Sequence, residues 1–484
     1  MKRPSIHWFR SDLRLADNPA LDAAVREGGP VVPVFVWAPD EEGSWAPGSA
    51  SRWWLHQSLE ALNADLRALG SRLILRRGPS LPALIQLARE TGARALFWNR
   101  RYEPAVAARD AQIRDELQRS GLNVEMFNAA LLHEPEAIRN QSGKPFQVFT
   151  PFWKRCLAEP DPPEPTSRIE RLSAPAAWPA SLRLDAFDLE PSPDWAGGLR
   201  DAWQPGEAGA QANLRHFLSS AFAEYAEQRN RPDVRGTSRL SPHLHFGEIG
   251  PRQVWHDLER MAAGRRLPVA TWRGSAFLAE VGWREFSHHL LWHFPHTPEE
   301  PLRPAFAKFP WRTEPAFLEA WRRGRTGYPI VDAGMRELWA TGWMHNRVRM
   351  IAASFLVKDL LLPWIEGARW FWDTLVDADL AQNTLGWQWV AGCGADAAPY
   401  FRIFNPVSQG QKFDPHGDYV RRWCPELAEL PTQWIHRPHE APTEVLRAAG
   451  IEIGRAYPEP IVSHAIAREV ALEAYGRISA TKGN

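Results

Sequence analysis

The chain has 484 residues, 44% of them hydrophobic, so it can bury a large core and form more than one domain. Its 57 basic residues balance its 57 acidic ones, which excludes an overall basic surface as the basis of nucleic-acid binding. Any such binding needs a local basic patch. Three cysteines are too few for a disulfide framework, and the absence of a CxxC pair gives no indication of a zinc site, so we expect no metal.

Neither a secretory signal nor a membrane span is indicated. The N-terminus is basic but lacks a following apolar segment. The most apolar stretch, 351–365, is interrupted by Lys358, Asp359 and Pro363. We therefore expect a cytoplasmic protein that does not bind membranes. Tryptophan is unusually common, at 25 residues; these side chains serve as core anchors, as stacking surfaces for bases and as electron donors, and we expect more than half to fill the core.

The first 130 residues alternate short apolar runs with helical patterns. The runs that predict strands are 5–9, 31–37, 72–76, 95–98 and 123–127. Leucines at positions 55, 59, 62, 66 and 69 form one face of an amphipathic helix, with Ser51 as a start signal and Gly70 as a stop. This alternation predicts a parallel, Rossmann-like sheet covered by helices. The chain has no GxGxxG, P-loop or HExxH sequence, which disfavours a dinucleotide dehydrogenase, a P-loop NTPase and a zincin.

The remainder of the chain changes character twice. Residues 131–204 are rich in proline and charge, which predicts a connector of low intrinsic order laid over the surface. Helical patterns then dominate, so we predict an all-α domain over 205–475, followed by a short tail at 476–484.

Five segments carry a resemblance to a known family. They are WFRSDLRLADNPAL (8–21), GTSRLSPHLHFGEI (236–249), WREF (283–286), TGYPIVDAGMREL with TGWMHNRVRM (326–350), and DADLAQNTLGWQWVAGCGADAAPYFRIFNP (377–406). In this order and on this plan they resemble the photolyase/cryptochrome family, most closely the bacterial cyclobutane pyrimidine dimer photolyases of class I or of the plant-cryptochrome-like class III. The resemblance implies an antenna-chromophore role for residues 1–130 and a helical domain that binds FAD in a U shape together with the DNA lesion.

The resemblance also assigns a set of flavin neighbours. Taken alone, the hydroxyls of Thr237, Ser238 and Ser241 around Pro242 are most simply interpreted as helix caps, although the same donors suit a diphosphate. Likewise, Asp377 and Asp379 alone read as a solvated acidic turn. In the family, Arg349 pairs with Asp377, and the residues expected to bind FAD are Tyr225, Thr237, Ser238, Leu240, Ser241, Arg284, Arg349, Asp377, Asp379 and Asn383.

Asn383 matches the family position that faces the reactive N5 edge of the flavin. A neutral amide can hydrogen-bond a reduced flavin without delivering an acidic proton. Plant-type cryptochromes carry aspartate there. Asparagine at this position therefore favours a repair enzyme over a signalling photoreceptor.

A pocket for an extruded dimer needs aromatic walls, an apolar floor and polar groups that read the bases. By resemblance, Trp283 and Trp389 are the walls and Glu280 also stabilises charge on the dimer. The residues expected to contact UV-damaged DNA are Glu280, Trp283, Asn346, Arg347, Met350, Trp389, Arg402 and Lys412. Asn346 and Met350 are four apart, so they share a face if the segment is helical. His345 beside Asn346 favours cyclobutane dimers, because (6-4) photolyases place a histidine pair there.

Trp387, Trp364 and Trp311 match a three-tryptophan chain that carries electrons to the photo-excited flavin. Core packing is the ordinary role of any one of them. The triple match favours the relay, which activates the flavin and is distinct from repair itself.

The antenna chromophore is less well defined. Tyr102-Glu103 is followed by Pro104, so an acidic contact typical of one group of folate-binding relatives is missing. The segment 51–55 resembles plant cryptochromes and the photolyases nearest to them, which favours methenyltetrahydrofolate, with 8-hydroxy-deazaflavin or no antenna as alternatives. We expect a monomeric photo-lyase; the alternative function is a blue-light photoreceptor that signals to a protein partner.

Overall fold

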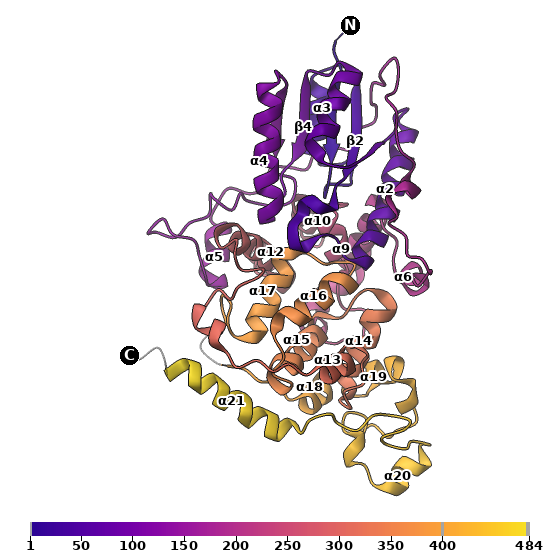
Figure 1. The fold of residues 1–484 in the computed structure, drawn as a ribbon, viewed down its shortest axis with the longest axis vertical. Coiled ribbons are helices and arrows are strands. Elements are labelled where there is room, and N and C mark those ends of the chain that lie inside the picture. Colours follow the sequence, from indigo (N-terminus) through magenta and orange to yellow (C-terminus); the bar gives the residue numbers. More distant parts are fainter. Residues whose placement is uncertain (1, 398–400, 481–484) are drawn as a thin grey trace. The chain divides into compact units, whose positions relative to one another are not determined.

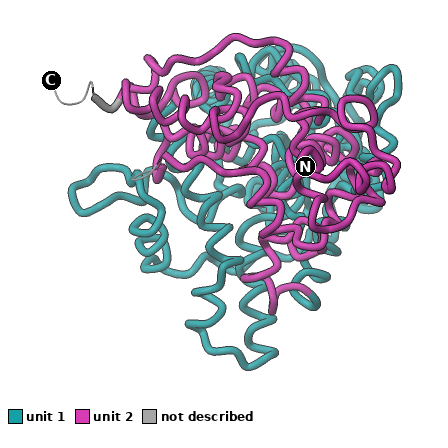
Figure 2. The backbone as a smooth tube through the Cα atoms, turned by 90° about the horizontal axis from the view of Figure 1, so that it is seen from below, with its two compact units in different colours: residues 1–220, 238–295, 376–379 teal, residues 221–237, 296–375, 380–484 magenta. Residues whose placement is uncertain are grey.

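The computed structural model describes residues 2–397 and 401–480 (Figure 1). The chain divides into two compact units, coloured separately in Figure 2. Unit 1 comprises residues 1–220, 238–295 and 376–379; unit 2 comprises 221–237, 296–375 and 380–484. This division differs from the predicted segments because much of the chain between 238 and 295 folds with the α/β part. The domain boundaries stay a prediction.

Unit 1 contains a five-stranded parallel sheet with strand order β3-β2-β1-β4-β5. The strands are β1 (Ser5–Phe9), β2 (Val31–Trp37), β3 (Ile74–Arg77), β4 (Ala95–Asn99) and β5 (Asn123–Phe127). Every residue of β1, β2 and β4 is buried, as expected for strands covered on both faces. The predicted parallel α/β fold is confirmed.

Four helices connect and flank these strands, as the labels in Figure 1 show for three of them. They are α1 (Pro19–Arg26), α2 (Ser49–Ala68), α3 (Ser80–Thr91) and α4 (Pro104–Arg119). The core of the sheet is aromatic as well as aliphatic, because Trp8 and Trp98 pack together with ring centroids 5.6 Å apart. This arrangement confirms that part of the tryptophan content serves as core.

Two predicted boundaries in the α/β part are wrong by two residues. Helix α2 begins at Ser49 behind the extended Gly48, and Ser51 is buried within its first turn instead of capping it. Strand β3 begins at Ile74, because the Leu73 amide donates to Asn63 Oδ1 (3.1 Å) and is therefore not free to join the sheet ladder.

The prediction of low order in the connector, residues 131–204, is wrong. Single buried apolar residues and backbone hydrogen bonds attach it to the α/β part. Phe187 is 1% exposed. The Leu182 amide donates to Leu75 O (3.0 Å) and the Val31 amide to Ser173 O (3.0 Å). The predicted connector also contains two helices, α5 (Phe149–Cys156) and α6 (Gly197–Ala202). Composition alone could not show these anchors.

After residue 205 the described chain forms helices and loops without a strand, and its one isolated bridge joins Ile453 and Tyr457. In unit 1 this region forms α7 (Glu207–His216), α9 (Ser241–His245), α10 (Pro251–Gly264), α11 (Val269–Arg273) and α12 (Ala276–His293). In unit 2 it forms α8 (Tyr225–Gln228), α13 (Pro315–Arg322), α14 (Pro329–Thr341), α15 (Asn346–Ser354), α16 (Trp364–Thr374), α17 (Leu380–Ala391), α18 (Pro406–Phe413), α19 (Asp418–Trp423), α20 (Thr443–Ala448) and α21 (His464–Ala480).

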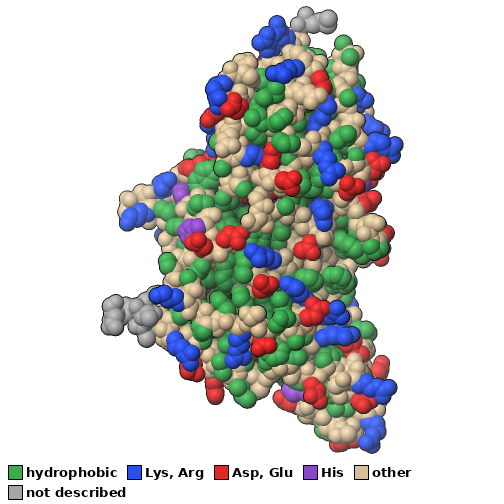
Figure 3. Space-filling model, viewed as in Figure 1, with side chains coloured by type: hydrophobic (Ala, Val, Ile, Leu, Met, Phe, Trp, Pro, Cys, Tyr) green, Lys and Arg blue, Asp and Glu red, His purple; other side chains and the backbone are tan. Residues whose placement is uncertain are grey.

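No helix within residues 2–397 and 401–480 combines the length and the apolar character that crossing a bilayer would require. On the face shown in Figure 3, basic and acidic side chains are interspersed. This agrees with the balanced charge of the sequence, so attraction to an anionic partner must come from a few arginines and lysines in a defined place.

Candidate active site

Helix α12 carries several of the predicted site residues of unit 1. It begins at Ser275, whose side chain accepts a hydrogen bond from the Leu278 amide (3.2 Å). Glu280 and Trp283 lie three positions apart and share a face of this helix, and both are half-buried. Their roles at a lesion site stay a prediction.

An aromatic residue that sequence reasoning missed lies against Trp283. The ring of Phe149, the first residue of α5, stacks on the indole with centroids 3.8 Å apart and planes 9° apart. Phe149 falls in the predicted connector, where composition suggested no fixed side chain. The sequence signal for a fixed aromatic side chain here was the aromatic-rich run FTPFW at residues 149–153.

Arg284 links α12 to the short helix α9. Its Nη1 donates to Ala130 O (2.5 Å) and its Nη2 donates to Leu244 O (3.4 Å). Helix α9 has Leu240 at its N-cap position, without a side-chain cap, and the following Ser241 is exposed. The simple capping interpretation of Ser241 is therefore wrong, and its hydroxyl can serve as a ligand donor.

Asp379 lies between two histidines that sequence reasoning did not assign to the site. One of its oxygens is 3.3 Å from His245 Nδ1 and 3.7 Å from His288 Nε2. Burial opposes ionisation of Asp379, but the charges of His288, His245 and Arg284, together with the His245 hydrogen bond, outweigh it and hold the pKa below its ordinary value. Asp379 is therefore an ionised hydrogen-bond acceptor at neutral pH.

Glu285, next to Arg284, is a buried carboxyl group of a different kind. Its Oε2 accepts hydrogen bonds from the amides of Leu132 (2.9 Å) and His133 (3.2 Å). Burial is the largest influence and raises its pKa to about 7, although Arg284 and the two amides favour the charged form. This group ties the end of the α/β part to α12.

In unit 2, the loop around residue 236 packs against α8. A Cβ added to Gly236 would lie 2.7 Å from the Cβ of Gln228, so only glycine permits this approach. The contact holds Thr237 near α8, which begins with the buried Tyr225. Tyr225 and Thr237 thus lie on two segments that pack together.

Helix α17 presents Asn383 and Trp387 on the face that packs against α16. Asn383 Nδ2 donates to Ala368 O (3.0 Å), which fixes the amide plane while its second N–H and its carbonyl oxygen remain to bind a ligand. A Cβ added to Gly367 would lie 2.0 Å from the Trp387 ring, so the indole fills the space above this glycine.

The other two tryptophans of the predicted relay lie close along the chain to these contacts. Trp364 is three positions before Gly367 and so shares a face of α16 with it. The Arg312 amide donates to Leu361 O (2.8 Å), which brings the segment of Trp311 to the start of α16. Trp387 is 2% and Trp364 6% exposed, whereas Trp311 is half-buried. Trp311 is therefore the most exposed of the three, and their role as a relay stays a prediction.

Helix α15 confirms the predicted helical face of Asn346 and Met350. Arg347, on the next position, donates from Nη2 to Asn230 Oδ1 (2.7 Å), and Asn230 is a partner that the sequence did not reveal. The Arg347 guanidinium lies 4.4 Å and the Lys412 ammonium 5.2 Å from the centroid of one ring, that of Phe413. Two cations are therefore gathered on one aromatic side chain.

Arg349, the predicted partner of Asp377, donates from Nε to Met344 O (2.7 Å). Asp377 and Asp379 occupy the loop before α17, as the family pattern implied. The pairing of Arg349 with Asp377 stays a prediction.

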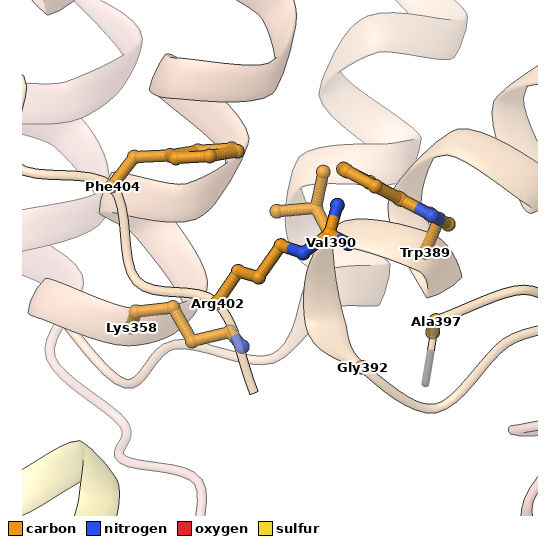
Figure 4. A pocket seen from close by; sticks show the side chains of 7 residues that line it. All are labelled: Lys358, Trp389, Val390, Gly392, Ala397, Arg402 and Phe404. Carbon is orange, nitrogen blue, oxygen red and sulfur yellow. The ribbon is translucent and has the colours of Figure 1, made fainter. Parts of the chain in front are cut away.

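A small pocket in unit 2 contains Trp389 and Arg402 (Figure 4). The arginine extends toward the indole, and its guanidinium carbon lies 5.5 Å from the ring centroid. Lys358, which also lines the pocket, is 1% exposed, and its Nζ lies 3.1 Å from the Phe401 ring centroid. Burial lowers the pKa of Lys358 well below its ordinary value. The pocket thus combines an aromatic wall with basic groups.

One group of potential metal ligands occurs in the described part of the chain, away from these residues in the sequence. Single ligand atoms of Glu164, His256 and Glu259 lie within 4.8 Å of one another. His256 Nε2 contacts Pro162 O (2.9 Å) and its Nδ1 contacts Glu259 (3.0 Å). These contacts attach the connector to α10, and we assign no metal to them.

Comparison with known proteins decides the family. The family model described as "DNA photolyase" matches residues 5–170, and the one described as "FAD binding domain of DNA photolyase" matches residues 277–477. A deoxyribodipyrimidine photo-lyase from Agrobacterium fabrum is 50% identical over 479 residues, covering 99% of this chain and 98% of the relative. The chain belongs to the photolyase/cryptochrome family.

Two further photolyase/cryptochrome relatives define its place in the family. The crystal structure of a bacterial class III photolyase from Agrobacterium tumefaciens has a TM-score of 0.95 and 49% identity, covering 99% of this chain and 98% of that one. Cryptochrome-1 from Arabidopsis thaliana is 45% identical over 95% of this chain and 68% of its own length. The predicted family is confirmed, with similarity to both class III photolyases and plant cryptochromes. As a member of this family, the chain binds FAD.

Proposed function

We propose that this chain is a light-dependent deoxyribodipyrimidine photo-lyase that repairs cyclobutane pyrimidine dimers in DNA. The observation that carries the proposal is the near-full-length similarity to a deoxyribodipyrimidine photo-lyase and to a class III photolyase structure. The resemblance assigns the dimer pocket to Glu280 and Trp283, which lie on α12, and to Asn346, Met350 and Trp389, which lie on α15 and α17.

The described residues fit FAD chemically. In unit 1, Ser238 and Ser241 supply hydroxyl donors, Arg284 supplies charge for a diphosphate, and Asp379 is an ionised acceptor for a flavin N–H. In unit 2, Tyr225, Thr237, Arg349 and Asn383 complete the set. Reduced FAD, once bound and excited by light, supplies an electron to the dimer and recovers it after the two bonds between the pyrimidines split.

Asn383 holds the flavin edge without protonating it. Its Nδ2 already donates one hydrogen to Ala368 O at 3.0 Å, so the amide cannot rotate freely. The remaining N–H and carbonyl oxygen offer hydrogen bonds but no acidic proton. Asn383 would therefore hold the flavin edge by hydrogen bonds and would leave a reduced flavin unprotonated.

The lesion is bound by Trp283 and Trp389 as aromatic walls, with Met350 as the apolar contact and Asn346 as a polar reader. Extruding a dimer costs a few kcal/mol of stacking and pairing, roughly what stacking on two aromatic side chains can recover. Glu280 donates a hydrogen bond or shares a proton with a dimer carbonyl, which stabilises negative charge on the split pyrimidines.

DNA affinity comes from a few cations that meet phosphates near the lesion. Arg347 and Lys412 share the ring of Phe413, and Arg402 lies over Trp389. These three residues position the strand and carry no sequence preference. The protein therefore recognises the lesion by shape and stacking.

The tryptophan relay is a separate function of unit 2. Trp311, Trp364 and Trp387 would carry electrons inward toward bound oxidised FAD, with Trp311 as the outermost of the three. Trp387 is held by close contact with Gly367 and by the ring of Phe371, whose centroid is 5.0 Å away. This packing fixes its orientation, as efficient electron transfer requires.

For the antenna we favour methenyltetrahydrofolate. In open parallel sheets a ligand usually binds where the strand order reverses, here between β1 and β4. At that edge Arg10 is bound to Asp110 and to Asn99 O, and Asn99 also donates to Asn18 Oδ1 (2.7 Å). Both Nη atoms of Arg10 and the side chain of Asn99 are thus engaged by neighbouring residues, so a chromophore bound by them would have to replace these contacts. Extraction of the chromophores from purified protein and their absorption spectra decide the question.

The protein acts as a monomer in the cytoplasm in this proposal. The alternative is a blue-light photoreceptor, suggested by the similarity to Cryptochrome-1. Conversion of a dimer-containing oligonucleotide under blue light separates the two functions, with a dark sample as control. We expect conversion in the light alone. Bound FAD without conversion would support the photoreceptor.

A further inference from the structure

Phe149 occupies an unusual place for a residue at the end of an exposed loop. Its ring lies parallel to that of Trp283 at 3.8 Å between centroids, and it also contacts Phe286 edge-on at 6.0 Å. The preceding Val148 is 49% exposed, so this stack begins directly at the surface of unit 1. Phe149 therefore covers one face of an indole whose side chain is only half-buried.

The rest of α5 anchors this ring. Phe152 is 2% exposed and packs on Phe286 with centroids 5.1 Å apart. Trp153 lies over α12 so closely that a Cβ at Gly282 would come within 2.6 Å of its ring. Because the following turn of α5 packs on α12, the backbone that carries Phe149 is fixed beside Trp283.

The loop before α5 is held as well. The Phe146 amide donates to His289 Nε2 (3.0 Å), and the Phe146 ring packs on Phe152 at 6.0 Å. Burial lowers the pKa of His289 to about 3, so this nitrogen remains an acceptor at neutral pH. Contacts on both sides of Phe149 therefore define its position.

We infer that Phe149 is a positioning residue that fixes the ring of Trp283 for stacking on an extruded pyrimidine dimer. The inference rests on the proposed function, because it assigns to Trp283 the role of a lesion wall. A side chain already held in its binding orientation loses less conformational freedom when the ligand arrives, so preorganisation increases affinity. The Phe149 ring also blocks movement of the Trp283 indole toward the face that it covers.

The test compares Phe149→Ala, Phe149→Leu and Phe149→Tyr, with Val148→Ala as the neighbouring control. Binding of dimer-containing and intact oligonucleotides is measured by titration, together with FAD content and thermal unfolding. We expect Phe149→Ala to lose about three- to tenfold in affinity for the dimer, in line with the strength of an aromatic stack, and to bind intact DNA as before. Phe149→Tyr retains the affinity because it keeps the flat ring.

Phe149→Leu separates the loss of the flat ring from the loss of packing, because leucine keeps apolar volume at this position and removes the flat face. We expect its affinity for the dimer to fall like that of Phe149→Ala while its FAD content and unfolding temperature stay near those of the parent. Wild-type affinity for the dimer in Phe149→Leu would overturn the inference.

A double-mutant cycle with Trp283→Ala connects the effect to the indole. We expect Phe149→Ala to reduce affinity less than twofold once Trp283 is absent. An equal loss in both backgrounds would show that Phe149 acts elsewhere. If Trp283→Ala alone leaves lesion affinity unchanged, the proposed lesion wall fails, which is a separate result.

Discussion

Glu285 shows how a single buried carboxyl group links stability to pH. Its folded pKa is about 7, above its ordinary value of 4.5, so the folded protein binds a proton more tightly than the unfolded chain. The stabilisation is fully present below pH 4.5 and is lost as pH rises through 7. Burial is the main cause, and it outweighs the two amides that donate to Oε2 and Arg284, whose Nη1 lies 4.0 Å from Oε1.

We therefore expect Glu285→Gln to stabilise the protein at pH 8 by up to about 3 kcal/mol and to change little at pH 4.5. Glutamine keeps the acceptor for the Leu132 and His133 amides and cannot ionise. Urea unfolding of both proteins at the two pH values measures the difference. Equal stabilities at pH 8 would show that Glu285 ionises there without cost.

Trp311 allows the two electron-transfer functions to be separated. In Trp311→Phe the outer end of the relay is interrupted, because phenylalanine is a poorer electron donor. We expect photoreduction of oxidised FAD to slow at least about tenfold. This slowing corresponds to an increase of about 1.4 kcal/mol in the activation free energy. Repair by chemically reduced enzyme should be unchanged. A comparable loss in both assays would mean that Trp311 supports the fold or the lesion site.

At the level of elements, the contact between α16 and α17 is as close as the chain allows. A Cβ added to Gly367 on α16 would lie 2.0 Å from the Trp387 ring, whereas one added to Gly386 on α17 would meet open space. The two glycines therefore form a matched pair for testing the interface.

Gly367→Ala should force the helices apart, destabilise the protein by about 1–3 kcal/mol and slow photoreduction. Gly386→Ala should stabilise the protein by about 0.5–1 kcal/mol, because alanine is the better helix former and nothing obstructs it. Thermal unfolding and flavin photoreduction rates measure both effects. A tolerated Gly367→Ala would contradict the close packing of Trp387.

The elements that sequence predicted well are those whose pattern is local. β1, β2 and β5 were predicted to the residue, and for β1 and β2 the reason is that a fully buried apolar run has sharp ends. The start of β3 was misplaced because the side chain of Asn63, on the preceding helix α2, accepts a hydrogen bond from the Leu73 amide. Helix α5 was missed because its apolar residues serve a partner helix, α12, about 130 residues away, and no local pattern reveals that partner.

The candidate site was predictable where a motif fixes both residue type and element, as for Asn346 and Met350 on α15 or Trp387 on α17. Its supporting residues were not. His245, His288, Asn230 and Phe149 act through contacts between segments distant in sequence. Such contacts depend on packing, which the sequence pattern of one segment does not contain.

At the scale of the whole molecule, charge predicts how DNA binding responds to salt. The chain has no net charge, so affinity must come from local contacts such as Arg347, Arg402 and Lys412. If each neutralises one phosphate, the logarithm of the binding constant falls with that of the salt concentration with a slope of about −3.

Lys412→Ala should reduce this slope by about 0.9 for dimer-containing and intact DNA alike. Arg119→Ala removes one charge from an exposed position on α4 and serves as the matched control, with an unchanged slope expected. Titrations at several salt concentrations measure both. Equal changes in the two variants would mean that overall charge, not a local site, attracts DNA.

In the proposed reaction the electron given to the dimer returns to FAD, so light alone drives repeated repair. Fully reduced protein is sealed without oxygen or added reductant, given an excess of dimer-containing oligonucleotide and illuminated, and the dimers split per bound FAD are counted. We predict many dimers split per FAD with the cofactor still reduced at the end. Repair that stops at one dimer per FAD, or none at all, would contradict the claim.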